Sequence, residues 1–135
     1  MKILYFPLEA QYYDMIECGE KSEEYREKTA YWIARLLEWR SIQGSLEVVD
    51  NRITTDIKRT RVTMAEARMI VDGSIMEVSG RVLAPKHYDA ACFSYGYTKR
   101  RMLWECKGIT FGQGRPEWGA PDHETFITKL GRRIQ

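Results

Sequence analysis

The order in which strand-like and helix-like patterns follow one another is the feature that most constrains this chain. A short apolar run over residues 3–6 ends at Pro7 and is typical of a buried strand. Apolar residues over 8–16 then repeat with the period of one helix face, and Gly19 follows where a cap glycine is expected. Residues 23–28 alternate as in a strand, and Thr29 is placed to cap a second helix whose spacing reaches Trp39. The first third therefore predicts strand, helix, strand, helix.

The remaining two thirds of the chain read mostly as strands. Between residues 41 and 87 we expect strands at 46–49, 53–57 and 74–83, and a helix at 63–71. Three further strands are expected at 90–97, 102–111 and 124–130. The last two are separated by GQGRPEWGAPD, a long glycine and proline loop of the kind that is often functional.

These patterns predict one α+β domain with a strand-rich core, curved into a partly closed β-barrel of about five or six strands. A chain of 135 residues is long enough to bury such a core without disulfides or metal. Its three cysteines are widely spaced and are expected to be reduced thiols, most of them buried. The sequence shows neither a membrane span nor a signal peptide, so we expect a cytoplasmic protein.

Charge is distributed unevenly along the chain. Residues 1–50 carry six Lys or Arg and ten Asp or Glu, a balance of −4, whereas residues 98–135 carry eight and four, a balance of +4. A basic C-terminal third suggests a face that binds anions, although basic residues also serve simply to solvate a surface.

The stretch GEKSEEYR, residues 19–26, gathers the charges with the clearest chemical meaning. In a strand, Glu24 and Arg26 point to the same face, and Lys21 starts near that face. Lysine, glutamate and arginine in one cleft would supply cationic donors for a phosphate or carbonyl and a carboxylate for a nucleobase amino group or a proton. The structural alternative is an ion-pair network that fixes helix to strand.

The segment YYDMIECGEKSEEYR resembles the signature of the ASCH domain, a PUA-like family, whose pattern G-x-K-x-x-E-x-R is matched by Gly19, Lys21, Glu24 and Arg26. GYTKRRMLWECKGI and GRPEWGAPDHETFITKLG are similar to one branch of that family. The resemblance covers residues 3–40 and about 88–134, so residues 41–87 are expected to be an insertion. It implies a PUA-like barrel flanked by helices, with a cleft beside the motif.

The resemblance also implies that the partner is RNA or a modified nucleoside. Some family members hydrolyse N4-acetylcytidine and others have been described as ribonucleases, so hydrolysis of an acylated cytidine or of RNA is a second hypothesis. In it Lys21 acts as base or nucleophile, Glu24 orients water and Arg26 balances charge. The amidohydrolases carry threonine where this chain has Glu24, which argues against a simple transfer of that activity. A third hypothesis is a protein-partner module that acts through the insertion.

Outside the motif, basic and aromatic residues gather after the strand at 90–97. Basic side chains beside aromatic rings suit phosphate contact with base stacking, although an exposed hairpin turn would look the same. Two residues farther along are candidates as well: a glutamate within an apolar strand and a tryptophan in the long loop. The ligand-binding candidates are Gly19, Tyr97, Lys99, Arg100, Arg101, Glu105 and Trp118.

Neither a metal site nor a cofactor is predicted. His87 and His123 lack ligand spacing with each other or with the cysteines, and the glycines around Gln113 lack the strand and helix context of a dinucleotide fingerprint.

Overall fold

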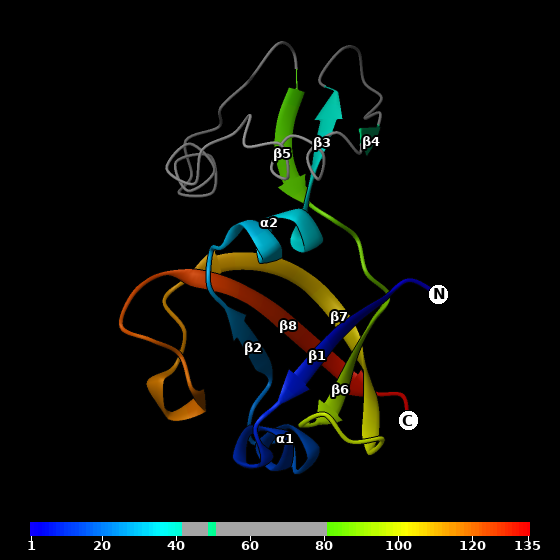
Figure 1. The fold of residues 1–135 in the computed structure, drawn as a ribbon, viewed down its shortest axis with the longest axis vertical. Helices are drawn as coiled ribbons and strands as arrows, with labels where there is room; N and C mark the ends of the chain where they lie inside the picture. Colours follow the sequence, from blue (N-terminus) through cyan, green and yellow to red (C-terminus); the bar gives the residue numbers. More distant parts are fainter. Residues whose placement is uncertain (42–48, 51–80) are drawn as a thin grey trace. The chain divides into compact units, whose positions relative to one another are not determined.

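The computed structural model describes residues 1–41, 49–50 and 81–135 (Figure 1). The chain forms two compact units. The first consists of residues 1–26 and 87–135, and the second of residues 27–86.

The first unit is built on one five-stranded sheet in the order β1-β6-β7-β8-β2. β1 and β6 are parallel, and the other neighbours are antiparallel. The sheet curls into a half-barrel, with helix α1 (Ala10–Glu17) at one end and the short 3-10 helix η1 (Pro116–Trp118) in a loop beside it (Figure 1). The strands are β1 (Ile3–Leu8), β2 (Glu23–Arg26), β6 (Ala90–Tyr95), β7 (Arg101–Gly112) and β8 (Thr125–Arg133). The predicted mixture of helix with a partly closed barrel is confirmed, and its PUA-like detail stays a prediction.

The curl of the sheet follows from an irregularity in β7. Residues 101–105 pair with β6, and pairing with β8 begins at Trp104 and continues to Gly112, with shifts of register between Trp104 and Cys106 and between Cys106 and Gly108. Such bulges bend a strand and increase its twist. One long strand therefore turns the corner between the two halves of the sheet.

The core of the first unit lies on the inner face of the sheet. Alternate residues of β1 are buried, and Phe6 stacks on Phe93 of β6 with ring centroids 5.6 Å apart. The prediction that this strand ends at Pro7 was wrong, because β1 continues to Leu8. β1 is an edge strand, and a residue that lacks an amide N–H is tolerated there.

The second unit contains helix α2 (Ala30–Leu36) and a sheet in the order β4-β3-β5. Its strands are β3 (Leu37–Ser41), β4 (Val49–Asp50) and β5 (Arg81–Pro85). Thr29 caps α2 as predicted, because its hydroxyl accepts a bond from the Trp32 amide at 3.4 Å.

The prediction that the second helix reaches Trp39 was wrong. Lys86 ends α2 by donating from its backbone amide to Leu36 and from its ammonium group to Ala34, at 2.8 and 2.9 Å. The chain then becomes extended, and Leu37 pairs with Pro85 of β5. Pairing with a strand distant in sequence overrides the local helical spacing.

Most of the elements expected within 41–87 lie outside the described residues: the strands at 46–48 and 53–57, the helix at 63–71 and the strand residues 74–80. The end of the last strand is described, and it extends to Pro85 rather than Leu83.

Candidate functional site

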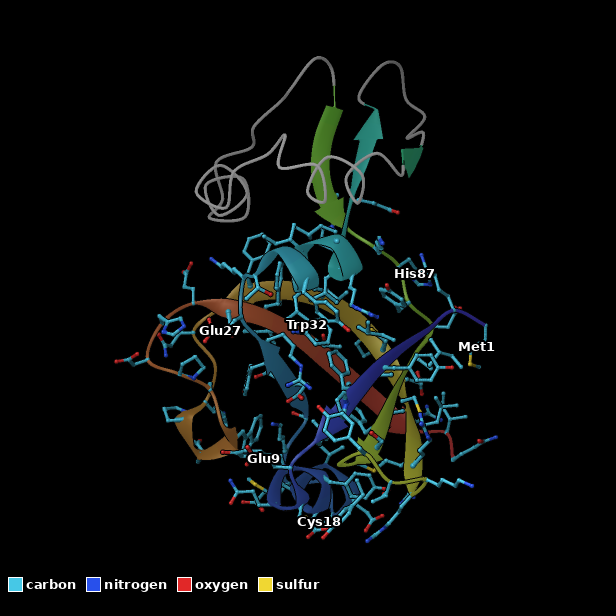
Figure 2. All side chains as sticks on the ribbon, viewed as in Figure 1. Met1, Glu9, Cys18, Glu27, Trp32 and His87 are labelled. Atoms are coloured by element: carbon cyan, nitrogen blue, oxygen red, sulfur yellow. The ribbon has the colours of Figure 1, made fainter. Side chains whose placement is uncertain are left out.

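The end of helix α1 sets the position of Lys21. The helix ends at the cap residue Cys18, which is labelled in Figure 2. Gly19 follows with a φ of 86°, in the left-handed region that favours glycine. The amides of Gly19 and Lys21 donate to Ile16 and Met15, both at 3.0 Å, and so satisfy carbonyls at the end of the helix. The chain therefore reverses directly, and Lys21 is turned into the interior.

Lys21 is buried with its polar contacts in place. Only 2% of the residue is exposed. Its ammonium group donates to Glu24 Oε1 at 3.0 Å and to the Trp118 carbonyl at 2.6 Å, and lies 4.5 Å from the centre of the Tyr12 ring. A carboxylate, a carbonyl and a ring face thus surround a cation that has three protons to donate. The hydrogen-bonding capacity of the buried Lys21 side chain is therefore met within the protein.

Arg26 contacts the other oxygen of Glu24. Its Nη1 lies 3.0 Å from Glu24 Oε2, yet the angle does not make a hydrogen bond, and Oε2 is left as a buried acceptor with no hydrogen-bond partner. The short distance still provides charge compensation, so we treat the contact as an ion pair that leaves hydrogen-bonding capacity unused. Side-chain exposure is 22% for Arg26 and 4% for Glu24, so the arginine is the more open side of this cluster.

Arg26 also connects the two edge strands of the half-barrel. Its Nη2 donates to the Pro7 carbonyl of β1 at 2.9 Å, and its guanidinium lies 5.0 Å from the centre of the Phe6 ring. β1 and β2 are the first and last strands of the sheet and do not pair with each other. One side chain therefore links the edges that backbone hydrogen bonds leave apart.

The loop at residues 113–124 packs against β2, as predicted for GQGRPEWG. The Tyr25 hydroxyl donates to Glu23 at 2.9 Å and accepts from the Arg115 amide at 3.1 Å. The Tyr25 ring shares a buried cluster with Trp118, Ala120 and Ile127. Burial raises the pKa of Tyr25 to about 12, against an ordinary value of 10.0. The loop thus covers the second face of β2, and both central residues of that strand are buried.

The structure brings Lys21, Glu24 and Arg26 together, with Gly19 beside them, as the spacing indicated. It places Trp118 in the packed loop, where the backbone carbonyl rather than the ring contacts Lys21. Whether any of these residues binds a ligand or takes part in catalysis stays a prediction.

The remaining candidates lie elsewhere on the first unit. Glu105 accepts from the Arg132 amide at 3.3 Å and lies 3.9 Å from Lys107, so its described partners belong to the strands β7 and β8 rather than to the Lys21 cluster. Arg100 pairs with Glu17 at 3.0 Å and lies about 5 Å from the Tyr13 and Tyr95 rings, so it fixes the β6–β7 turn to helix α1.

The turn between β6 and β7 presents the other basic residues. Tyr97 is 98% exposed at its tip, and Lys99 and Arg101 are exposed beside it. Neither cation has a hydrogen bond or ion pair through its side chain to any residue that the structure describes. We name Tyr97, Lys99 and Arg101 the basic hairpin. These residues are available to a ligand, whereas Arg100 is already engaged.

Sequence reasoning missed two aromatic partners of the motif. Tyr12 lies under the Lys21 ammonium group, and the Tyr25 hydroxyl holds the loop. Tyr12 belongs to the apolar stripe of α1, where it was indistinguishable from a core residue. The Trp118 carbonyl lies 97 residues from Lys21 in sequence, and no local pattern indicates such a contact.

Three further observations bear on the class of protein. Within the described parts of the chain, no three His, Cys, Asp or Glu side chains are grouped to hold a metal ion. The described helices are all too short or too polar to cross a membrane. Comparisons with models of protein families, with curated proteins and with solved structures gave no match for this chain.

Proposed function

We propose that this chain is an ASCH-type, PUA-like domain that binds single-stranded RNA through the basic hairpin. The observation that carries the proposal is the exposed tyrosine of this hairpin with two cations whose side chains have no protein partner. An exposed ring stacks on an unpaired base, and neighbouring cations contact the phosphates on either side of it.

The fixed shape of the hairpin supports the proposal. Thr98 Oγ1 donates to the Tyr95 carbonyl at 2.6 Å, and Ser94 Oγ donates to the Gly96 carbonyl at 2.7 Å. The Gly96 amide donates to Leu8 of β1 at 2.8 Å. These bonds hold the turn in one conformation, so Tyr97 is presented to a base with little further loss of backbone entropy.

The test is a titration of short single-stranded RNA at several salt concentrations. Tyr97→Ala should weaken binding about ten-fold, as expected when one stacked base is lost. Lys99→Gln should weaken binding across all sequences and make the salt dependence shallower, because one phosphate contact is removed. Arg115→Gln is the matched control: it removes the same charge from an exposed side chain, and it should leave affinity nearly unchanged.

Three results would overturn the proposal: no binding of RNA, binding that is insensitive to salt, or equal losses in the Lys99→Gln and Arg115→Gln variants. The last result would mean that only the net charge of the protein matters.

A second candidate function is binding of a modified nucleoside at the motif, and Glu24 Oε2 favours it. A nucleobase amino group could donate to this buried acceptor if Arg26, the more exposed member of the cluster, moved aside. Glu24→Gln should then abolish the binding of modified nucleosides while leaving RNA binding by the hairpin intact. Equal nucleoside affinity in the two proteins would contradict this second candidate.

The geometry favours binding over hydrolysis. A nucleophilic lysine has to be neutral with a free lone pair, whereas the Lys21 ammonium group donates to Glu24 and Trp118. We therefore expect no turnover of N4-acetylcytidine or RNA by the natural protein. Gain of N4-acetylcytidine hydrolysis in Glu24→Thr alone would identify a binder on an enzyme-like scaffold. Turnover by the natural protein would restore the hydrolase hypothesis if Lys21→Ala abolishes it while circular dichroism shows that the variant is still folded.

A further inference from the structure

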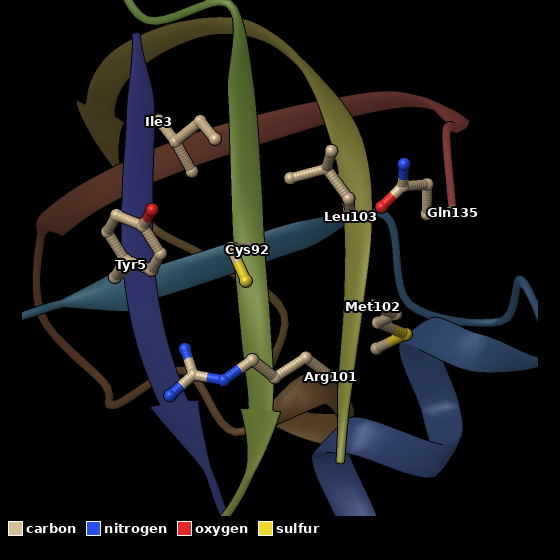
Figure 3. Close-up of a pocket in the computed structure, with 7 residues that line it drawn as sticks. All are labelled: Ile3, Tyr5, Cys92, Arg101, Met102, Leu103 and Gln135. Carbon is tan, nitrogen blue, oxygen red and sulfur yellow. The ribbon is translucent and has the colours of Figure 1, made fainter. Parts of the chain in front are cut away.

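A pocket of about 360 Å³ lies on the outer face of the sheet, away from the motif (Figure 3). It spans β1, β6 and β7, where Tyr5, Cys92 and Leu103 occupy paired positions on neighbouring strands. Its volume is at the lower end of the range for small-ligand sites, about 300–1,000 Å³. The lining of the pocket includes Ile3, Tyr5, Cys92, Arg101, Leu103 and Gln135.

The lining combines one aromatic face, an apolar floor and one cation. Tyr5 is 53% exposed, so part of its ring is open to a ligand. Figure 3 shows the Arg101 side chain extending from β7 across β6, with its guanidinium over β1 on the side of Tyr5 and Cys92. That guanidinium has no ion pair or hydrogen bond with any described residue. The pocket therefore contains an unmatched positive charge beside a ring.

We propose that this pocket binds a planar aromatic ring that carries a phosphate, that is, a nucleotide. The ring packs on Tyr5 and over the floor formed by Ile3, Cys92 and Leu103. The phosphate pairs with Arg101, whose planar fork of donors matches its oxygens in a bidentate manner. The amide of Gln135 lies at the opposite wall, where it can exchange hydrogen bonds with the ring edge.

The single cation and the apolar floor together disfavour an occupant that is only apolar or only anionic. A purely apolar ligand would bury the guanidinium without a counter-charge, which is costly. Inorganic phosphate alone would leave the Tyr5 ring and the apolar floor exposed to water. A ring and an anion on one small molecule satisfy both halves of the pocket.

This site goes beyond the proposed RNA binding and does not depend on it. Arg101 borders both sites, but Tyr97 and Lys99 are not part of the pocket, and Tyr5 and Cys92 are not part of the hairpin. Variants of these residues therefore test the two proposals separately.

The experiment uses Cys92 as a reporter in the full chain. Cys92 is only 9% exposed and its thiol lines the pocket, so an alkylating reagent reaches it through the pocket and an occupying ligand should slow the reaction, followed residue by residue with mass spectrometry. Cys18 is exposed and outside the pocket, and serves as the internal control. Burial raises the pKa of the Cys106 thiol, which slows its reaction and keeps it from obscuring the comparison. The probes are adenosine 5′-monophosphate, adenosine and inorganic phosphate.

We expect adenosine 5′-monophosphate to protect Cys92 at a concentration about ten-fold lower than adenosine, the gain expected from one charge-assisted pair of bonds. Arg101→Gln should remove that difference between the two ligands. Tyr5→Ala should weaken the binding of both adenosine and its monophosphate. Lys99→Gln, with the same charge change outside the pocket, should leave protection unchanged. RNA with a 5′-phosphate and RNA with a 5′-hydroxyl distinguish a chain end from a free nucleotide as the source of the ligand.

Equal protection of Cys18 and Cys92, equal potency of adenosine and its monophosphate, or full protection in Arg101→Gln would overturn the inference. If the protein does not bind RNA through the hairpin but nucleotides still protect Cys92, the RNA proposal is wrong and the nucleotide pocket is supported.

Discussion

Loss of Lys21 should destabilise the fold strongly, because its charge is buried against Glu24. Lys21→Ala leaves that carboxylate with a hydrogen bond from the Tyr25 amide at 3.1 Å and the off-angle contact to Arg26, and it removes the cation buried beside it, so we expect the free energy of unfolding to fall by about 3–5 kcal/mol. Chemical denaturation measures the change. Lys99→Ala, an exposed lysine, is the control and should lie within about 0.5 kcal/mol of the natural protein.

The double variant Lys21→Met/Glu24→Leu separates the ion pair from the packing. Apolar replacement of both partners removes the unpaired charge, so it should be less destabilising than Lys21→Ala alone. If Lys21→Ala and Lys99→Ala lower the free energy of unfolding by the same amount, the buried ion pair is not a source of stability.

Tyr25 makes stability depend on pH in the alkaline range. Its pKa is 10.0 in an ordinary setting and about 12 in the fold, so its contribution is complete below pH 10. Between these values the unfolded chain loses a proton that the folded chain retains, and the free energy of unfolding falls as pH rises. We expect the advantage of the natural protein over Tyr25→Phe to shrink by about 2 kcal/mol across this range.

The measurement is denaturation of both proteins at a series of pH values, with tyrosinate absorbance to follow ionisation. A constant difference between the two proteins above pH 10 would contradict the assignment of the raised pKa to Tyr25.

At the scale of elements, the loop that covers β2 depends on a glycine in close contact with an aromatic ring. Gly119 has a φ of 94°, and a Cβ there would lie 2.7 Å from the Tyr12 ring. Gly119→Ala should therefore strain the backbone and displace the Tyr12 ring, and together these effects should lower the free energy of unfolding by about 2–3 kcal/mol.

Gly19→Ala is the matched control for the loop. Its φ of 86° is similar, but no atom lies within 4 Å of the added Cβ, so only the strain of about 1 kcal/mol is expected. Thermal denaturation compares the two. Equal shifts in the two variants would mean that the Tyr12 contact contributes nothing.

Elements with strong local signals were predicted from sequence, and those that depend on distant partners were not. Helix α1 and strands β6, β7 and β8 follow from periodicity, and Thr29 from its capping chemistry. The end of α2 depends on Lys86, which lies 52 residues from Ala34. Burial of Tyr25 and Glu24 together depends on a loop that begins almost ninety residues later, as the 90-residue span of the bond from Arg115 to Tyr25 shows.

The same distinction holds for the candidate site. The proximity of Lys21, Glu24 and Arg26 follows from strand alternation after a glycine cap. The role of Arg26 as a link between β1 and β2 required knowledge of which strands are the edges of the sheet. Local spacing therefore indicated that the three charged side chains lie close together, but not that Arg26 joins the two edge strands of the half-barrel.

At the scale of the whole chain, the register of the second unit offers a test of whether residues 42–80 are needed for RNA binding. Ser41 and Arg81 are directly paired on antiparallel strands. Residues 42–80 can therefore be replaced by Asn-Gly, which suits a two-residue hairpin turn. If the basic hairpin binds RNA, the shortened chain should keep its RNA affinity, measured by the same titration.

Arginine and lysine residues are removed with this segment, so the comparison belongs at a salt concentration that screens distant charges. A folded shortened chain that no longer binds RNA would place the binding surface in residues 42–80 instead.

The parallel pairing of β1 with β6 has a consequence for synthesis of the chain. The contact between Lys2 and Asp89 at the start of this pair spans 87 residues, and at about 5–20 residues per second the ribosome needs roughly 5–15 seconds to supply the second strand. Throughout that interval the apolar strand Ile3–Leu8 has no neighbour in the sheet. A chain built this way has the greatest need of chaperone protection at its N-terminus, before the strand that will cover it exists.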